Sequence, residues 1–179
     1  MNRTLFSVPD FLSPDECSVV IRETEQRGFA AAPITTAFGF KMVPEVRNNT
    51  RVMVDDCELA ARLWDRFQEA AELPPVPGWH PVGLNERFRY YRYTSGQAFR
   101  WHRDGAFVRN VTQQSLLTFM VYLNEDFGGG STEFEHESVV PKTGYALVFD
   151  HGLRHQGAEV THGTKYVLRS DILFERNPA

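Results

Sequence analysis

Short extended segments separated by turn residues fill the C-terminal half of this chain, and they constrain its fold more than any other feature. Apolar and aromatic runs predict strands at 88–93, 99–102, 116–123, 132–134, 145–149 and 165–174. Turn sequences separate these runs: Ser95-Gly96, Asp104-Gly105, Gly128-Gly129-Gly130 and Pro141-Lys142-Thr143-Gly144. Many short strands with regular turn signals are typical of a sandwich, a barrel or a jelly roll.

The N-terminal part has the signals of helices instead. Ser13 is suited to the N-cap, Pro14 to the first helical position and Glu16 to the capping box, so we expect a helix from here to about Arg27. Gly28 is a natural stop for that helix.

A second helix is predicted from Asp55-Asp56 to about Leu73, because apolar residues recur there at helical spacing: Leu59, Leu63, Phe67 and Ala70. The proline-rich stretch 74–81 predicts a loop. Helices first and strands second favour an α+β, mainly β domain, with the N-terminal helices packed on one sheet.

Composition narrows the class of protein. A chain of 179 residues is long enough for one domain, so we expect a single domain over residues 1–179. The net charge of −4 lacks the basic excess of a non-specific nucleic-acid binder. Cys17 and Cys57 predict no disulfide framework, and the N-terminal residues contain no apolar stretch of a secretory signal. No apolar run approaches the length of a membrane span, so we expect a cytoplasmic protein.

The triplet His102-Arg103-Asp104 is the main candidate for chemistry. Alternate residues of a strand share a face, so His102 and Asp104 could bind one ion, with His155 as the third ligand. Two histidines and one carboxylate form the facial triad of non-heme Fe(II) oxygenases. The triplet alone is weak, because roughly 0.8 His-x-Asp/Glu would arise by chance in this composition. Lys165 adds a cation ten residues after His155, as a dianionic co-substrate would require.

Further motifs surround these residues in a fixed order. They are Arg92-Tyr93-x-x-Gly96-Gln97, Val121-Tyr122-Leu123-Asn124, Gly129-Gly130-x-Thr132-x-Phe134, Gly144-x-Ala146-Leu147-x-Phe149 and Gly163-x-Lys165. With the histidines and the aspartate, they resemble the catalytic core of Fe(II)/2-oxoglutarate-dependent dioxygenases, within them the prolyl-4-hydroxylase-like branch. The resemblance covers about 88–174 and, more loosely, the helical half. It implies a double-stranded β-helix, a jelly-roll core at 85–176, with residues 1–80 as helical support and a lid.

The same resemblance implies roles for single residues. His102, Asp104 and His155 would ligate Fe(II), and Lys165 would hold the distal carboxylate of the co-substrate 2-oxoglutarate. The hydroxyl of Tyr122 would help to bind that carboxylate, whereas Thr132 and Tyr93 would line the co-substrate pocket. The other participants implied are O2 and ascorbate as a reductant.

Two of these assignments have a competitor. His151 lies four residues before His155 and could be the third ligand, but a bystander or second-shell role is favoured for it. Arg169 shares the predicted strand face of Lys165 and could itself bind 2-oxoglutarate or a substrate carboxylate. Its alternative role is an ion pair with Asp171 or Glu133.

Two segments have an open role. Residues 32–51 form either a lid over the substrate or two short extra strands. Residues 86–110 interleave six arginines with seven aromatic residues, a pattern of nucleic-acid binders as well as of an ordinary strand pair. Of these arginines, Arg100, Arg103 and Arg109 could attract an acidic substrate.

The leading hypothesis is a hydroxylase that acts on a C–H bond of a peptidyl-proline or an amino-acid-like small molecule, with release of succinate and CO2. The first alternative is a nucleic-acid dealkylase of the same superfamily, although the acidic pI argues against a nucleic-acid partner. The second is a non-catalytic jelly-roll binding module. The substrate and the oligomeric state are not specified by these patterns.

Overall fold

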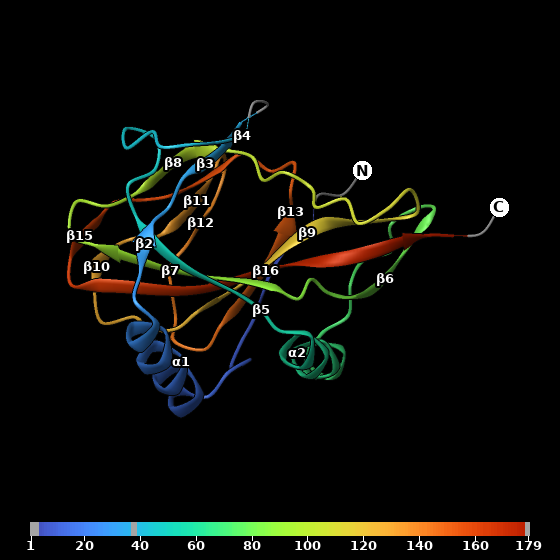
Figure 1. Ribbon diagram of the computed structural model, residues 1–179. Coiled ribbons are helices and arrows are strands. Elements are labelled where there is room, and N and C mark those ends of the chain that lie inside the picture. Colours follow the sequence, from blue (N-terminus) through green and yellow to red (C-terminus); the bar gives the residue numbers. More distant parts are fainter. Residues whose placement is uncertain (1–3, 37–38, 178–179) are drawn as a thin grey trace.

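Two antiparallel sheets form the body of the protein, seen in a computed structural model that describes residues 4–36 and 39–177 (Figure 1). The larger sheet follows the order β1 (Leu5–Val8), β13 (Ala146–Asp150), β9 (Gln113–Tyr122), β16 (Thr164–Arg176), β7 (Arg87–Thr94), β5 (Thr50–Asp55) and β2 (Ala30–Ala31), and β6 (Trp79–Leu84) also pairs with β16. The smaller sheet has the order β12 (Ser138–Val139), β11 (Thr132–Phe134), β14 (His155–Gly157) and β8 (Phe99–His102). Two further pairs are β10 (Gly128–Gly129) with β15 (Val160–His162), and β3 (Ile34–Thr36) with β4 (Gly39–Lys41).

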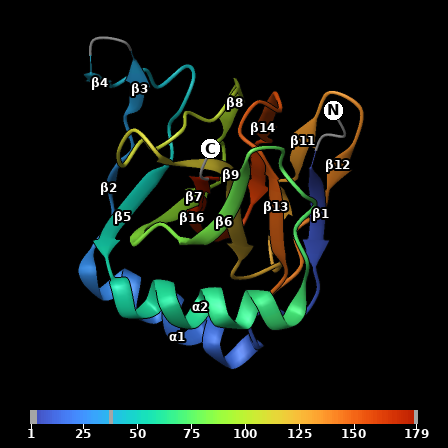
Figure 2. The ribbon, with the colours of Figure 1, turned by 90° about the vertical axis from the view of Figure 1, so that its right-hand side faces the viewer.

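Both predicted helices are present, and they lie side by side beneath the strands in Figure 2. Helix α1 (Pro14–Arg27) has the expected capping box: the Glu16 N–H donates to Ser13 Oγ over 3.1 Å, and the Ser13 N–H donates to the Glu16 carboxylate over 2.8 Å. Helix α2 (Cys57–Ala70) is capped by Asp56, which accepts a hydrogen bond from the Leu59 N–H.

The predicted end of α2 at Leu73 was wrong by three residues. Ala71 already has an extended backbone, and its N–H closes the helix on the Phe67 carbonyl. Leu73 precedes Pro74, a position that disfavours the helical conformation. Ala71 and Leu73 instead pack against the apolar core.

The larger sheet buries both of its faces, because successive side chains of a strand point to opposite sides. One face packs on the helices, where Phe119 of β9 meets Phe11 and Phe67 edge to face at 5.3 and 5.9 Å between ring centroids. The other face packs against the smaller sheet through a second core that includes Met120, Leu147, Phe149, Phe134 and Val160. The predicted α+β, mainly β fold with a jelly-roll core and helices on one sheet is confirmed.

One strand, β6, lies partly where the sequence predicted a loop at 74–81. β6 begins at Trp79 and includes Pro81, and its register with β16 shifts at this proline. A proline donates no ladder hydrogen bond, so it is tolerated at such an irregularity. In the 32–51 segment, β3 and β4 are the two short extra strands of the second interpretation. Within the described residues, no helix is both long and apolar enough to cross a membrane.

Candidate active site

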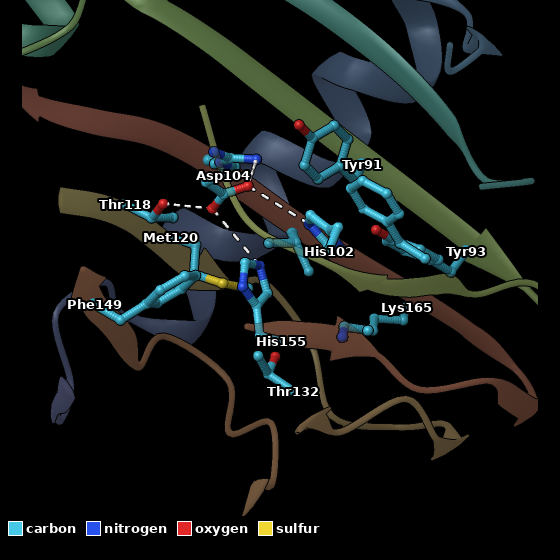
Figure 3. Close-up of a pocket in the computed structure, with 14 residues that line it drawn as sticks. Tyr91, Tyr93, His102, Asp104, Thr118, Met120, Thr132, Phe149, His155 and Lys165 are labelled. Carbon is cyan, nitrogen blue, oxygen red and sulfur yellow. Dashed lines mark hydrogen bonds and ion pairs between the residues drawn. The ribbon is translucent and has the colours of Figure 1, made fainter. Parts of the chain in front are cut away.

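The three candidate metal ligands meet at the end of the smaller sheet. His102 on β8 lies directly opposite His155 on β14 in the antiparallel register. Asp104 comes from the loop after β8, where its N–H donates to the His151 carbonyl over 3.1 Å. Its two carboxylate oxygens lie 3.5 Å from His102 Nε2 and 3.6 Å from His155 Nε2 (Figure 3). All three ligand atoms fit within 4.8 Å of one another, although Asp104 reaches the site from a loop and not from the predicted strand.

Backbone carbonyls orient both imidazoles. His102 Nδ1 is 2.8 Å from the Arg100 carbonyl oxygen, and His155 Nδ1 is 2.9 Å from the Leu153 carbonyl oxygen. A carbonyl oxygen only accepts, so each Nδ1 carries the proton and each Nε2 presents its lone pair to the site. Burial lowers the pKa of His155 to about 4, which keeps its ring neutral.

Asp104 is ionised in this setting. Burial opposes the charge, but the Arg169 guanidinium, 3.0 Å away, outweighs burial and holds the pKa of this carboxyl well below its ordinary value. The donor set is therefore two neutral imidazole nitrogens and one carboxylate. That set fits Fe(II), a divalent ion that accepts both ligand types.

A chain of buried hydrogen bonds supports Asp104 from behind. Thr118 Oγ donates to the carboxylate over 2.6 Å, so the 3.0 Å contact between Thr118 and His151 Nδ1 has the histidine as donor. His151 Nε2 then accepts from Ser115 Oγ over 2.8 Å, and that oxygen accepts the Phe107 N–H. His151 thus lies outside the ligand cluster and beside it. Thr118 was not among the residues predicted from the sequence; the available signal was a small hydroxyl side chain inside a mainly apolar predicted strand.

The opposite end of the pocket holds Lys165. Its side chain is buried, and its ammonium donates to the Gly130 carbonyl over 2.6 Å between the rings of Tyr93 and Tyr122. The Tyr122 hydroxyl lies 2.7 Å from Thr132 Oγ. No carboxylate pairs with Lys165 in the part of the chain that the structure describes, and burial lowers its pKa to about 7. A buried ammonium without an anion is costly, so this end of the pocket fits an anionic group such as the 2-oxoglutarate tail.

Gly130 is required at this position by its surroundings. Its φ of +67° is in the left-handed region, and an added Cβ would lie 2.8 Å from the Phe127 ring and 3.2 Å from Lys165 Cδ. A larger residue would therefore displace the lysine that its carbonyl group holds.

Arg169 differs from Lys165 although both side chains line the same pocket. Its guanidinium lies 3.0 Å from Asp104 and 3.4 Å from Asp171, so two carboxylates already pair with it. Its expected ion pair with Asp171 is present, whereas Glu133 bonds to Gln156. Of these two cations, Lys165 lacks an anionic partner, and Arg169 lies on the side of the metal ligands.

Comparison with known proteins finds solved structures that share this fold. The fold is shared with the viral collagen prolyl hydroxylase of Paramecium Bursaria Chlorella virus-1, solved as a 2OG complex, with a TM-score of 0.65, 22% identity and coverage of 96% of this chain and 97% of that one. It is also shared with a Pseudomonas putida prolyl-4-hydroxylase, with a TM-score of 0.69, 16% identity and coverage of 98% and 94%. A third such structure is a Trichoplax adhaerens prolyl hydroxylase in complex with a peptide fragment of the hypoxia inducible factor oxygen degradation domain. Its TM-score is 0.70, with 16% identity and coverage of 94% and 82%. Among curated proteins, none matches the sequence.

The family model of the 2OG-Fe(II) oxygenase superfamily matches residues 88–170, from β7 through most of β16. Residues 88–170 thus have the sequence pattern of this superfamily, and the chain has the fold of the prolyl hydroxylases named above. A match to this superfamily implies Fe(II), 2-oxoglutarate and O2 as participants.

Proposed function

We propose that this protein is an Fe(II)- and 2-oxoglutarate-dependent hydroxylase, with His102, Asp104 and His155 as the iron ligands. The single observation that carries the proposal is the pairing of two groups in one pocket. An ionised carboxylate and two neutral imidazoles converge at one side, and the buried cation Lys165 lacks an anion at the other. Fe(II) and a dicarboxylate co-substrate satisfy both requirements at once.

Bound Fe(II) supplies the oxidation of a substrate C–H bond by O2, coupled to the conversion of 2-oxoglutarate to succinate and CO2. The protein's part is to bind and orient the reactants and to exclude water. The Lys165 ammonium would neutralise the distal carboxylate, and the Tyr122 hydroxyl, positioned by Thr132, would donate a hydrogen bond to it. Tyr93 forms an apolar wall beside them. Arg169 would hold the Asp104 carboxylate in place and would not bind 2-oxoglutarate.

For the substrate, we propose a C–H bond of a peptidyl-proline or of an amino-acid-like small molecule. Support comes from the prolyl-hydroxylase fold and from the Trichoplax adhaerens structure, whose bound partner is a peptide fragment. At 16–22% identity this likeness concerns the fold, so it favours neither kind of substrate over the other.

Two further points belong to the proposal. Ascorbate would act as the reductant that returns oxidised iron to Fe(II). A reducing cytoplasmic location is consistent with Cys17 and Cys57, which are both free.

Anaerobic absorption spectroscopy of the purified apoprotein tests the assignment. Fe(II) followed by 2-oxoglutarate should produce a visible charge-transfer band that needs both additions. His102→Ala should abolish the band, whereas His136→Ala, a change at an exposed histidine between β11 and β12, should retain it. Wild-type protein that binds Fe(II) without developing the band on addition of 2-oxoglutarate would refute the proposal. The non-catalytic binding module would then be the better interpretation.

A further inference from the structure

A wide cleft opens outward from the candidate iron site, and arginines dominate its walls. Its volume is about 570 Å³, within the range of small-ligand sites, and it reaches His102 and Asp104. The net charge of the whole chain is −4, so this positive cleft does not reflect a basic composition. Six arginines line it: Arg47, Arg51, Arg87, Arg89, Arg103 and Arg169.

Strand register aligns three of these arginines in a row. Arg89 on β7 lies directly opposite Arg169 on β16. Arg51 on β5 lies opposite Tyr91, which is two residues from Arg89 and on the same face of the sheet. Like charges on neighbouring strands destabilise a sheet unless anions separate them.

Only three of the six arginines that line the cleft are paired with carboxylates. Asp171 lies 3.1 Å from Arg89 and 3.4 Å from Arg169, and Asp55 pairs with Arg87 over 2.8 Å. Across residues 4–36 and 39–177, no carboxylate pairs with the remaining three: Arg47, Arg51 and Arg103. Arg100 and Arg109, in contrast, pair with Glu159 and Glu86 and do not line the cleft.

Arg47 is the most constrained of the three. The residue is 4% exposed, and its guanidinium carbon lies 4.5 Å from the Tyr91 ring centroid and 4.4 Å from that of Phe99. Its Nε donates to the Asn49 side chain over 2.7 Å, but its buried Nη2 has no hydrogen-bond partner. A buried donor without a partner is rare and costly. The two rings hold the guanidinium in a fixed orientation, which suits recognition of a planar anion.

Arg51 also lines the cleft and, like Arg47, has no carboxylate partner among the described residues. Its guanidinium carbon lies 6.0 Å from the ring centroid of Phe40 on β4, which also lines the cleft. Burial, together with the charges of Arg47 and Arg89, lowers its pKa, as expected for a cation that lacks a counter-ion.

We propose that the substrate carries a carboxylate, which Arg47 and Arg51 bind in this cleft while the C–H bond to be oxidised points toward His102 and Asp104. The inference rests on the proposed function, and it adds the charge of the substrate. Lys165, the proposed partner of the 2-oxoglutarate tail, lines the inner pocket at the iron site and not this outer cleft. The carboxylate bound in the cleft would therefore belong to a second molecule. Its source is either the free carboxylate of an amino-acid-like molecule or an acidic side chain beside the target residue of a peptide.

Calorimetric binding to the full-length protein with saturating 2-oxoglutarate, and with Zn(II) replacing Fe(II) to prevent turnover, tests this inference. Two pairs of probes separate the sources. N-acetyl-L-proline is compared with N-acetyl-L-prolinamide, and a proline peptide flanked by two aspartates is compared with the same peptide flanked by two asparagines. The charged member of one pair should bind about 10-fold tighter or more, in line with hydrogen bonds to charged groups.

Arg51→Gln should remove this preference, and Arg51→Lys should retain part of it. Arg62→Gln on the exposed surface of α2 makes the same change in net charge and should leave the preference intact. Circular dichroism establishes that each variant is folded, and Arg103→Gln serves as a second cleft variant that should reduce the preference.

Equal binding of charged and neutral probes by the wild type, no binding by any of the four, or an unchanged preference in folded Arg51→Gln would overturn the inference. The charge-transfer band tests the proposed function separately. A normal band without charge preference refutes the anionic substrate alone. A missing band with intact preference refutes the proposed oxygenase chemistry and leaves a carboxylate-binding cleft.

Discussion

The two faces of the larger sheet are built from the same strands but differ in chemistry. On β9, Phe119 and Val121 point to the helices and are fully buried among apolar residues. Their neighbours Thr118 and Tyr122 point to the smaller sheet, where their hydroxyls contact Asp104 and Thr132. Because successive side chains of a strand point to opposite faces, residues that stabilise the core alternate along β9 with residues that belong to the site.

β16 has the same division. Leu168 and Ile172 belong to the helix-side core. On or beside the site side, Lys165 and Asp171 are buried charged residues and Arg169 is a partly buried one. Burying charges destabilises a fold unless they are paired. Apolar packing on the helix-side face therefore offsets the cost of the unpaired Lys165 ammonium on the site-side face.

The largest effect on activity is expected at the proposed iron ligand His155. His155→Ala removes one of three protein ligands, so Fe(II) affinity and turnover should fall by more than about 100-fold, since even second-shell changes cost 10–100-fold. The midpoint of thermal unfolding of the apoprotein should change much less than it does in Phe119→Ala. Metal-binding titration with measurement of succinate release checks both. Retention of near-normal Fe(II) affinity would show that His155 is not a ligand.

On the helix side, a substitution should reduce stability and leave Fe(II) affinity almost unchanged, the reverse of the effect at His155. Phe119→Ala leaves a cavity between Phe11 and Phe67, so the free energy of unfolding should fall by about 3–5 kcal/mol. Where the variant is still folded, its Fe(II) affinity should be close to that of the wild type, because Phe119 points away from the site. Urea denaturation and metal titration measure the two quantities. A large loss of metal affinity in the folded variant would mean that the two faces are not independent.

A smaller effect is expected at Lys165, where affinity for 2-oxoglutarate and stability of the apoprotein should change in opposite directions. Lys165→Met should weaken 2-oxoglutarate binding by about 10-fold or more, because hydrogen bonds to charged groups are worth this much. The same change removes a buried ammonium, so it should stabilise the apoprotein. Calorimetry and thermal denaturation test the two signs, and a loss of both affinity and stability would contradict the role of Lys165 as an unpaired cation.

The pH dependence sharpens this prediction. The pKa of Lys165 in the folded protein is about 7, below its ordinary value, so the unfolded chain holds this proton more tightly. The cost of burying the ammonium is fully present below pH 7, and stability should rise as the pH increases from there toward 10. Affinity for 2-oxoglutarate should instead decrease above pH 7, by up to about tenfold per pH unit. Lys165→Arg keeps its proton and is the control; an equal decrease in this variant would assign the pH effect to another group.

The smallest effect is expected behind the ligands, at Thr118. Thr118→Val removes the hydrogen bond to Asp104 but keeps the shape of the side chain, and Fe(II) affinity should fall by about 10-fold, at the lower end of second-shell effects. Thr118→Ser retains the hydroxyl and should restore most of the affinity. Competitive metal titration distinguishes the two variants, and equal affinities would show that the contact does not orient the carboxylate.

Local features of this protein followed from the sequence. The capping box at Ser13 and Glu16 and the strands at 99–102 and 132–134 were placed correctly, because they depend on neighbours within a few residues. The short strands β10, β12, β14 and β15 were missed, since none of them contains a run of apolar residues and their pairing depends on distant segments. The family resemblance was likewise visible from the order of motifs, and the match over 88–170 confirmed it.

The site itself was decided by tertiary structure. The sequence predicted His102 and His155 as candidate metal ligands, but only the pairing of β8 with β14 places them opposite each other. Nothing in the residues around Arg47 predicted that Tyr91 and Phe99 would enclose its guanidinium. Residue type and local spacing determined which chemical groups this protein carries. Sheet register and packing between distant segments decided which of those groups meet, because such contacts depend on the whole fold and not on near neighbours in the chain.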